Sequence, residues 1–396
     1  MILPARDKAH LVASRSYLTY GKAELRDKLE RNPYSYLHVI NPDGQQKIEA
    51  KRGTRPFYEC VKKGFDAFQD RGWIEAIESE TLAVYRQTSD DHVCTGLVGL
   101  MDLAEVESGR LKLHEQTLRS REKLFATYLD EVGCNAEPIL CAYPEDNMAA
   151  SQIAAHLAMI TAQRPDLDFS TTDRVRHTVW LLDTKQARLI SNASDEIPVM
   201  YLADGHHRVA SSRELAKQRP EINQQGLMSF AIPESELIIR GYHREMRKLS
   251  MTKSDWETLF QSLDAEIICS PLEASAPGPA AFGTIHLHTS HGSWKWELRK
   301  TNIQDVDAGW LYRQVLEPYF QVADARKDAR LHYLAGTESS EALMQRAKKY
   351  EDRCIFELHP VTMEQLKLIA DAGGTLPPKS TWIEPKLRTG LFIHGF

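Results

Sequence analysis

The segment richest in reactive groups is 201–208, which reads YLADGHHR. An apolar strand is expected to end at Asp204, and a helix is expected to begin directly after Gly205. The backbone N–H groups of Gly205, His206 and His207 would then lie at a helix N-terminus, where unpaired donors and the helix dipole attract an anion. Gly205 lets the backbone approach a ligand closely, and the two imidazoles add side-chain donors. The spacing predicts an anion site.

Asp204 and Arg208 extend this prediction to a phosphate with its metal ion. Arg208 can donate charge-assisted hydrogen bonds to phosphate oxygens. Asp204, placed beside an incoming phosphate, can hold a divalent cation such as Mg²⁺. The alternative is that Asp204 caps the helix and that the two histidines are ordinary surface residues.

A second candidate is the segment 111–117, which reads LKLHEQT. A short apolar strand would deliver His114 and Glu115 to the start of a charged helix. The Glu115 carboxylate could act as a general base toward a hydroxyl group. From the spacing alone, a solvated glutamate at the start of a helix is the simpler interpretation.

Three histidines within residues 286–291 could suggest a metal site. His286 and His288 alternate along a predicted strand, and His291 falls in the turn that follows it. The predicted partner strand offers only Glu297 as a further ligand. We therefore predict a polar face of a hairpin rather than a metal site.

The C-terminal tail 376–391 contains too many prolines for a helix and must run as extended chain. It presents Lys379, Ser380 and Thr381 together, a combination that suits a phosphate or a carboxylate. We expect this tail to close over the anion site. The alternative is a packed strap in which Trp382 and its apolar neighbours cover the core while the cations stay solvated.

The overall composition excludes several classes of protein. With 42% hydrophobic and 26% charged residues, the chain has the balance of an ordinary globular protein rather than a disordered one. A net charge of −6 provides no general attraction for nucleic acid or anionic membranes, so neither is expected as a partner. The N-terminus lacks the apolar core of a signal peptide, and the six cysteines are scattered without metal spacing. We expect a cytoplasmic protein with reduced thiols, and a homodimer is left open.

Predicted strands and helices alternate along the chain, which indicates a mixed α/β (α+β) fold. We expect an N-terminal α/β region over 1–110, a phosphate-binding core over 111–230, and a strand-rich region with C-terminal helices over 231–396. Helices are predicted at 21–31, 57–68, 116–130, 147–163, 208–217, 305–318, 338–350 and 362–372, and strands at 34–40, 81–86, 94–101, 139–143, 177–182, 198–203, 236–248, 265–270 and 284–299.

Several of these segments resemble a large bacterial and archaeal family of uncharacterised proteins. Its mark is an apolar strand followed by D-G-H-H-R, here residues 204–208. Three further blocks occur in the family's order: N-P-Y-S-[FY]-L-H at 32–38, H-E-x-T at 114–117 and P-P-K-S-T at 377–381. Many members also carry an apolar-Pro-Pro-Tyr-Asp stretch near the N-terminus, where this chain has VASRSY at 12–17.

Two of these blocks also resemble the free serine kinases of the ParB/sulfiredoxin-like fold. Those enzymes pair a strand–H-E–helix element with a later strand–D-G-H-H–helix element. The resemblance implies that Glu115 is a base on a substrate hydroxyl. It also implies a phosphate and metal site, made of Asp204, His206, His207 and Arg208, that takes ATP or ADP with Mg²⁺.

The residues and the resemblance together predict a phosphotransferase that acts on the hydroxyl of a small amino-acid-like substrate such as free serine. Phosphoryl transfer depends mainly on positioning and on charge neutralisation, which such a turn supplies. Three alternatives stay open at this point. One is a phosphohydrolase that acts on a phosphorylated hydroxy acid such as phosphoserine, and another is a nucleotide-binding regulator. The last is a plain structural or interaction protein.

Overall fold

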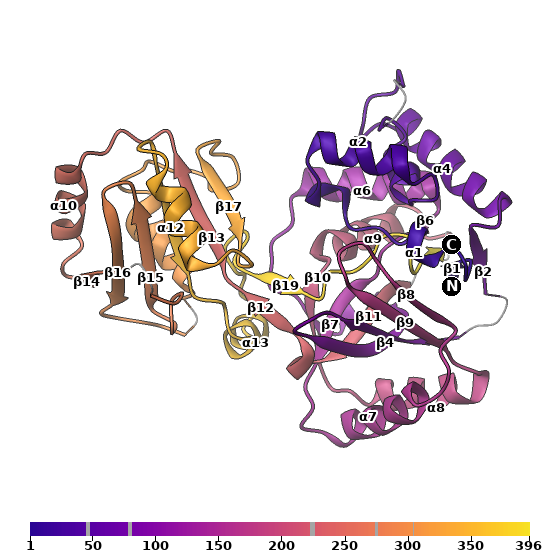
Figure 1. Cartoon of the computed structure of the whole chain (residues 1–396). Helices are drawn as coiled ribbons and strands as arrows, with labels where there is room; N and C mark the ends of the chain where they lie inside the picture. The colour runs from indigo at the N-terminus through magenta and orange to yellow at the C-terminus, as the bar shows by residue number, and fades with distance from the viewer. Residues whose placement is uncertain (45–47, 78–80, 222–225, 274–275, 304) are drawn as a thin grey trace. The chain divides into compact units, whose positions relative to one another are not determined.

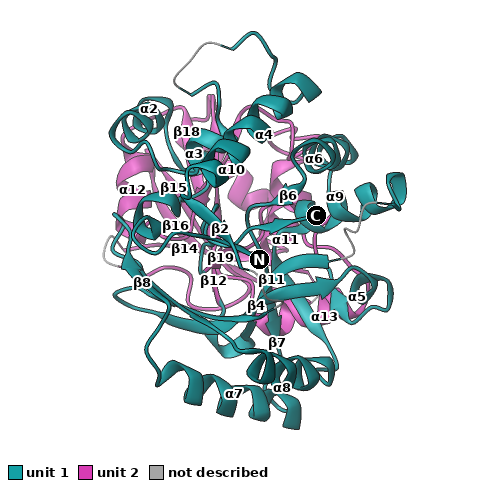
Figure 2. Ribbon diagram, turned by 90° about the vertical axis from the view of Figure 1, so that its right-hand side faces the viewer, with its two compact units in different colours: residues 1–113, 117–237, 385–396 teal, residues 114–116, 238–384 magenta. Residues whose placement is uncertain are grey.

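The structure is a computed structural model that describes residues 1–396 except 45–47, 78–80, 222–225, 274–275 and 304. The chain divides into two compact units, coloured separately in Figure 2. The first unit comprises residues 1–113, 117–237 and 385–396, and the second comprises 114–116 and 238–384. The chain therefore enters the second unit for three residues around Glu115 before returning to the first.

The first unit is built on an eight-stranded mixed sheet with the strand order β5-β10-β7-β11-β4-β3-β9-β8. Two neighbouring pairs are parallel, β10 with β5 and β11 with β7, and the other pairs are antiparallel. The strands are β3 (Ala83–Thr88), β4 (Val93–Asp102), β5 (Leu111–Lys112), β7 (Ile139–Tyr143), β8 (Leu167–Ser170), β9 (Arg176–Leu181), β10 (Met200–Asp204) and β11 (Gly226–Pro233).

Helices pack against this sheet through their apolar faces. Residues of α7 (Met148–Thr161) and α8 (Thr184–Asp195), among them Ile153 and Ile190, share a buried cluster with strand residues such as Leu202. A second pair, α6 (Arg119–Val132) and α9 (His206–Gln218), packs together through Leu129 and Leu215. Both pairs of helices can be followed in Figure 1. The sheet and α9 matter most for the site, because together they fix residues 204–208.

The N-terminal part of the first unit forms a smaller cluster with the last residues of the chain. Its elements are β1 (Ile2–Pro4), α1 (Ala9–Val12), the 3-10 helix η1 (Tyr17–Thr19), α2 (Lys22–Arg31), α3 (Leu37–Ile40), α4 (Arg55–Asp70), β2 (Ile74–Ala76), β6 (Cys134–Asn135) and β20 (His394–Gly395). Two short elements, α5 (Ala104–Glu107) and the 3-10 helix η2 (Glu234–Glu236), instead contact β5 and β4 of the large sheet, respectively. Ile2 and Ile393 exchange backbone hydrogen bonds of 2.8 and 3.0 Å, so the two ends of the chain lie side by side.

The strand predicted over 34–40 is wrong, because this segment forms a turn and the short helix α3. The Asn32 side chain accepts a hydrogen bond from the backbone N–H of Tyr34, and the Ser35 hydroxyl accepts one from the N–H of Leu37. Short polar side chains of this kind compete with a strand ladder by closing local turns. The aromatic and β-branched composition favours a strand, but Tyr34 and Tyr36 lie in the turn, and Val39 and Ile40 lie in α3.

The second unit contains a six-stranded antiparallel sheet with the order β14-β16-β15-β18-β13-β17. Its strands are β13 (Tyr242–Arg247), β14 (Ile267–Pro271), β15 (Thr284–Thr289), β16 (Gly292–Leu298), β17 (Leu331–Ala335) and β18 (Arg353–Leu358). Its helices are α10 (Lys253–Ser262), α11 (Asp307–Leu311) with the following π-helix Tyr312–Leu316, α12 (Ser340–Lys348) and α13 (Met363–Asp371). A separate ribbon pairs β12 (Ile238–Arg240) with β19 (Trp382–Glu384).

These observations confirm the mixed α/β class, with several separate sheets. The first two predicted regions, 1–110 and 111–230, contribute strands to the same eight-stranded sheet. No helix of the described residues is both long and apolar enough to cross a lipid bilayer.

Candidate functional site

The turn at 204–208 has the geometry that its sequence predicts. Strand β10 is buried between β5 and β7, and it ends at Asp204. Gly205 follows in the left-handed region with φ of 108°, and α9 begins at His206. A Cβ added to Gly205 would lie 2.8 Å from Cγ2 of Ile139, so no side chain fits at this position. The chain thus passes from a buried strand into a helix within one residue, which only glycine allows here.

The N-terminus of α9 is oriented by this turn. The N–H groups in the first turn of any α-helix point out of its N-terminal end, where the dipole favours negative charge. His206 and His207 are the first two residues of α9, with His206 buried and His207 half-buried. Their backbone and their rings therefore lie at the helix end that favours an anion.

Arg208 joins two carboxylates at this turn. Its Nη2 lies 3.2 Å from Oδ2 of Asp204, and its Nη1 donates to Oε1 of Glu137 at 2.6 Å. It also donates to the backbone carbonyl of Pro138. Burial alone would lower the pKa of Arg208, but the two carboxylates outweigh it and raise that pKa. The guanidinium is therefore held charged and fixed in orientation.

Glu137 links this network to the C-terminal tail. Its second carboxylate oxygen accepts a hydrogen bond of 2.7 Å from the Thr389 hydroxyl. A neighbouring tail residue, Arg388, is buried and pairs with Asp173 at 2.8 Å. The last part of the tail thus packs into the first unit, with the Arg388 guanidinium buried rather than solvated.

Asp204 is suited to an oxygen-ligated cation such as Mg²⁺. Its side chain is 42% exposed, although the strand that carries it is buried. Carboxylates at such strand ends are typical partial ligands of Mg²⁺, which keeps several waters and binds one or two protein carboxylates together with phosphate oxygens. The residues present fit a Mg²⁺–phosphate pair.

Glu115 belongs to the second unit, where it pairs with the start of the tail. It forms a parallel bridge with Leu376, whose N–H donates to the His114 carbonyl at 2.8 Å. Glu115 also acts electrostatically on Tyr242, although burial is the main reason why the pKa of Tyr242 is raised. Lys379 places its Nζ 5.7 Å from the centre of the same tyrosine ring. Tyr242 thus interacts electrostatically with Glu115, and the Lys379 ammonium lies beside its ring.

The two hydroxyl residues of the P-P-K-S-T block, Ser380 and Thr381, are buried. Ser380 is 4% exposed and donates its hydroxyl to the Pro377 carbonyl at 2.7 Å. Thr381 is 9% exposed. Their role as ligands of a phosphate or carboxylate stays a prediction, as does the role of Glu115 as a base.

Arg244 is a residue of this region that the sequence prediction missed. It is buried, and it donates to the carbonyls of Pro378 and Lys379 at 3.1 and 3.0 Å. Its guanidinium lies 4.6 Å from the ring centre of Tyr333, and burial lowers its pKa to about 10. The sequence does contain a signal for a buried arginine. Residues 242–247, YHREMR, have a strand-like pattern, and a charged side chain in a buried strand needs a polar partner.

Arg244 also lines a cavity of about 240 Å³ in the second unit. Tyr333 and two further arginines, Arg313 and Arg326, line it as well, together with Pro377 and Pro378 of the tail. The first prolines of the P-P-K-S-T block are therefore held against a cationic and aromatic cavity.

Comparison with known proteins gives a family match. A family model described as "Protein of unknown function (DUF1015)" matches residues 1–324. None of the curated proteins matches the sequence.

Several solved structures resemble the chain remotely. A C-terminally truncated SbnI from Staphylococcus aureus is 12% identical, with a TM-score of 0.38, and the match covers 74% of this chain and 84% of that one. A free serine kinase in complex with AMP is 12% identical, with a TM-score of 0.38 and coverage of 74% and 93%. A mutant free serine kinase in complex with ADP is also 12% identical, with a TM-score of 0.40 and coverage of 74% and 94%.

Proposed function

The chain belongs to this DUF1015 family of unknown function, and we propose that it transfers a phosphoryl group from ATP or ADP to the hydroxyl of a small amino-acid-like substrate such as free serine. The observation that carries the proposal is the turn at Gly205. There, a buried strand delivers an exposed carboxylate and a helix N-terminus to the same point. This combination suits a phosphate with its metal ion.

The helix end and Asp204 would have separate roles. The N–H groups in the first turn of α9 would hold the phosphate oxygens, with His206 and His207 as further donors. Asp204 would hold Mg²⁺, which supplies charge neutralisation on the phosphates when bound. Arg208 would keep the Asp204 carboxylate oriented and would add positive charge beside the phosphates.

Glu115 would act as the general base. Its carboxylate would accept the proton of the substrate hydroxyl as that oxygen forms its bond to the terminal phosphorus. The bond from this phosphorus to the bridging oxygen of the nucleotide would break, releasing ADP from ATP or AMP from ADP. Lys379, with Ser380 and Thr381 beside it, would bind the charged groups of the substrate.

The first test is which nucleotide the pure protein retains and consumes. We expect ATP or ADP to bind in the presence of Mg²⁺ and to be consumed only when a hydroxyl substrate such as serine is added. Consumption of phosphoserine with release of free phosphate would instead support the phosphohydrolase. Retention of CTP without turnover would support the regulator, and retention of no nucleotide would contradict the proposal.

A further inference from the structure

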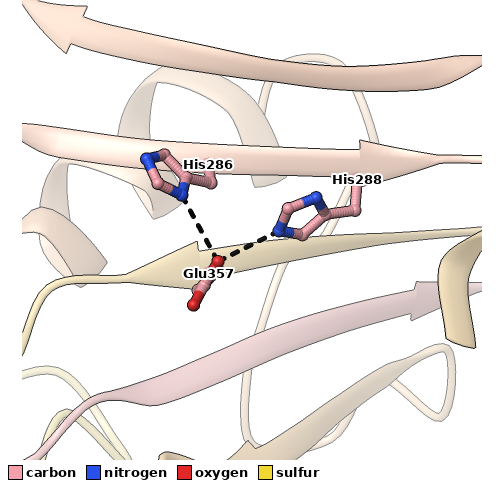
Figure 3. A group of neighbouring side chains, drawn as sticks. All are labelled: His286, His288 and Glu357. Atoms are coloured by element: carbon pink, nitrogen blue, oxygen red, sulfur yellow. Dashed lines mark hydrogen bonds and ion pairs between the residues drawn. The ribbon is translucent and has the colours of Figure 1, made fainter. Parts of the chain in front are cut away.

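Three side chains of the second unit converge from two neighbouring strands (Figure 3). His286 and His288 lie on the same face of β15, and Glu357 of β18 is the cross-strand partner of His286. Oε2 of Glu357 lies 3.4 Å from Nδ1 of His286 and 3.0 Å from Nε2 of His288. The predicted hairpin of β15 and β16 is confirmed, but its histidine face is not a polar surface.

The cluster is buried almost completely. His286 is 3% exposed, His288 0% and Glu357 3%. Helix α12 adds a fourth polar group, because the Ser340 hydroxyl donates to Oε1 of Glu357. Burying a carboxylate and two imidazoles is costly unless each polar atom finds a partner and the charge is balanced.

Hydrogen bonds within the cluster do not give every buried polar atom a partner, and no fixed cation of the described residues balances the carboxylate. Nδ1 of His286 is buried and faces Glu357, yet it makes no hydrogen bond of acceptable geometry. Among the described residues, no lysine or arginine forms an ion pair with the Glu357 carboxylate. The buried carboxylate is thus left without a fixed cationic partner.

The surrounding hydrogen bonds are those that orient metal ligands. The second ring nitrogen of His288, Nδ1, lies 3.0 Å from the Ser293 hydroxyl. Ser340 occupies the carboxylate oxygen of Glu357 that faces away from the histidines. Ligating histidines and carboxylates usually have such outer partners, which fix the tautomer and the direction of the lone pair.

We propose that His286, His288 and Glu357 bind a divalent transition-metal ion of the zinc class. Their three ligand atoms all lie within 4.8 Å of one another. Ligands about 2.1 Å from a tetrahedral Zn²⁺ stand about 3.4 Å apart, so the two distances from Glu357 to the histidines need little adjustment. Two histidines and one carboxylate form an established ligand set for Zn²⁺ and for Fe²⁺.

The burial indicates what such an ion would do. A site this closed gives a substrate no access, so the ion would join β15 and β18 rather than take part in the proposed transfer. A water molecule would complete the tetrahedron. The ion would thereby link residues that are 69 positions apart in the chain. This inference is independent of the proposed function, because neither the three ligands nor Ser340 has a role in the proposed phosphoryl transfer.

The test is the metal content of the full chain, purified without chelator and without a histidine tag. Elemental analysis is expected to find about one Zn²⁺ or Fe²⁺ per chain in the wild type. His291→Ala is the matched control, since His291 lies in the same hairpin but is exposed. This variant is expected to keep the ion, whereas His286→Gln and Glu357→Gln are expected to lose most of it.

A second measurement does not depend on how the variants fold. After chelation and addition of Co²⁺, the wild type is expected to show the visible absorption of a tetrahedral cobalt site, which Zn²⁺ then displaces. Equal metal content in wild type and a folded Glu357→Gln variant would overturn the proposal. A folded, metal-free wild type that binds neither Co²⁺ nor Zn²⁺ would overturn it as well.

Discussion

Arg208 reaches back one helical turn to Asp204, with its Nη2 3.2 Å from Oδ2 of the carboxylate. The ion pair joins the first turn of α9 to the last residue of β10. Because the Asp204 side chain is 42% exposed, the pair contributes little to stability by itself, typically about 0–1 kcal/mol. The proposed function therefore assigns this pair a role in binding rather than in folding.

Replacing Asp204 by asparagine is expected to remove metal-dependent nucleotide binding. The amide keeps the shape of the side chain but loses the charge that Mg²⁺ requires. Calorimetric titration with ATP should show that Mg²⁺ strengthens binding to the wild type but not to Asp204→Asn. Asp90→Asn is the control, because Asp90 is an exposed carboxylate of the same unit. An undiminished Mg²⁺ effect in Asp204→Asn would remove Asp204 from the metal site.

Arg208→Ala is expected to affect both binding and stability. Nucleotide affinity should fall by roughly 1.5–3 kcal/mol, the range for hydrogen bonds to charged groups. Stability should also fall, because Glu137 loses a 2.6 Å partner while its side chain is only 24% exposed. Arg208→Lys keeps the charge and should recover part of both losses. The role in binding is excluded if Arg208→Ala unfolds at lower denaturant but binds nucleotide as the wild type does.

Local patterns predicted several elements of the first unit, although the segment 34–40 forms a turn and a short helix rather than the predicted strand. The residues of β7 are those predicted, and the helix α4 encloses the predicted 57–68, because strand alternation and helical periodicity are local. The turn at Gly205 was predictable for the same reason. Glu357 was not predicted, because the hairpin pattern identifies only β16 as a neighbour of β15. Glu357 comes from β18, which pairs with β15 on the other side.

Asp307 gives the second unit a pH-dependent stability. It is 4% exposed, and burial, together with the nearby Asp305, raises its pKa to about 7 despite a hydrogen bond from the Gly283 N–H. Since the pKa is higher in the folded state than in the unfolded state, folding favours the protonated acid. Stability should therefore fall as the pH rises from about 4 to about 7, by up to about 4 kcal/mol at 1.36 kcal/mol per unit.

Asp307→Asn should remove this slope, because the amide is neutral and can still accept from Gly283. Urea unfolding at several pH values measures the effect, with Asp264→Asn as control since its side chain is 85% exposed. A variant with the same slope as the wild type would show that Asp307 is not the source.

Substitution of Lys379 tests whether the P-P-K-S-T block binds the substrate or only packs against the rest of the protein. Its side chain is exposed, while its backbone is held by Arg244 in the left-handed region with φ of 57°. Lys379→Ala should therefore leave the fold intact and raise the KM for the substrate. Lys348→Ala, at an exposed position of α12, is the control. An unchanged KM would assign the block to packing alone.

Glu115→Gln tests the proposed base. The amide keeps the shape but cannot accept the substrate proton, so turnover should fall by roughly 10²–10⁴. Nucleotide affinity should stay unchanged, because Glu115 is not assigned to the phosphates. A split of this kind between turnover and affinity would not arise from a purely structural role. Wild-type turnover in Glu115→Gln would assign the proton transfer to another group.

The most direct measurement is phosphorus NMR of the pure protein with serine and Mg²⁺, with either ATP or ADP as donor. The account predicts a phosphoserine signal that grows as the nucleotide is consumed, with ADP formed from ATP or AMP formed from ADP. The signal should be lost with Asp204→Asn and strongly reduced with Glu115→Gln. A folded wild-type protein that forms no phosphorylated product from either nucleotide, with serine or with related hydroxy amino acids, would contradict it.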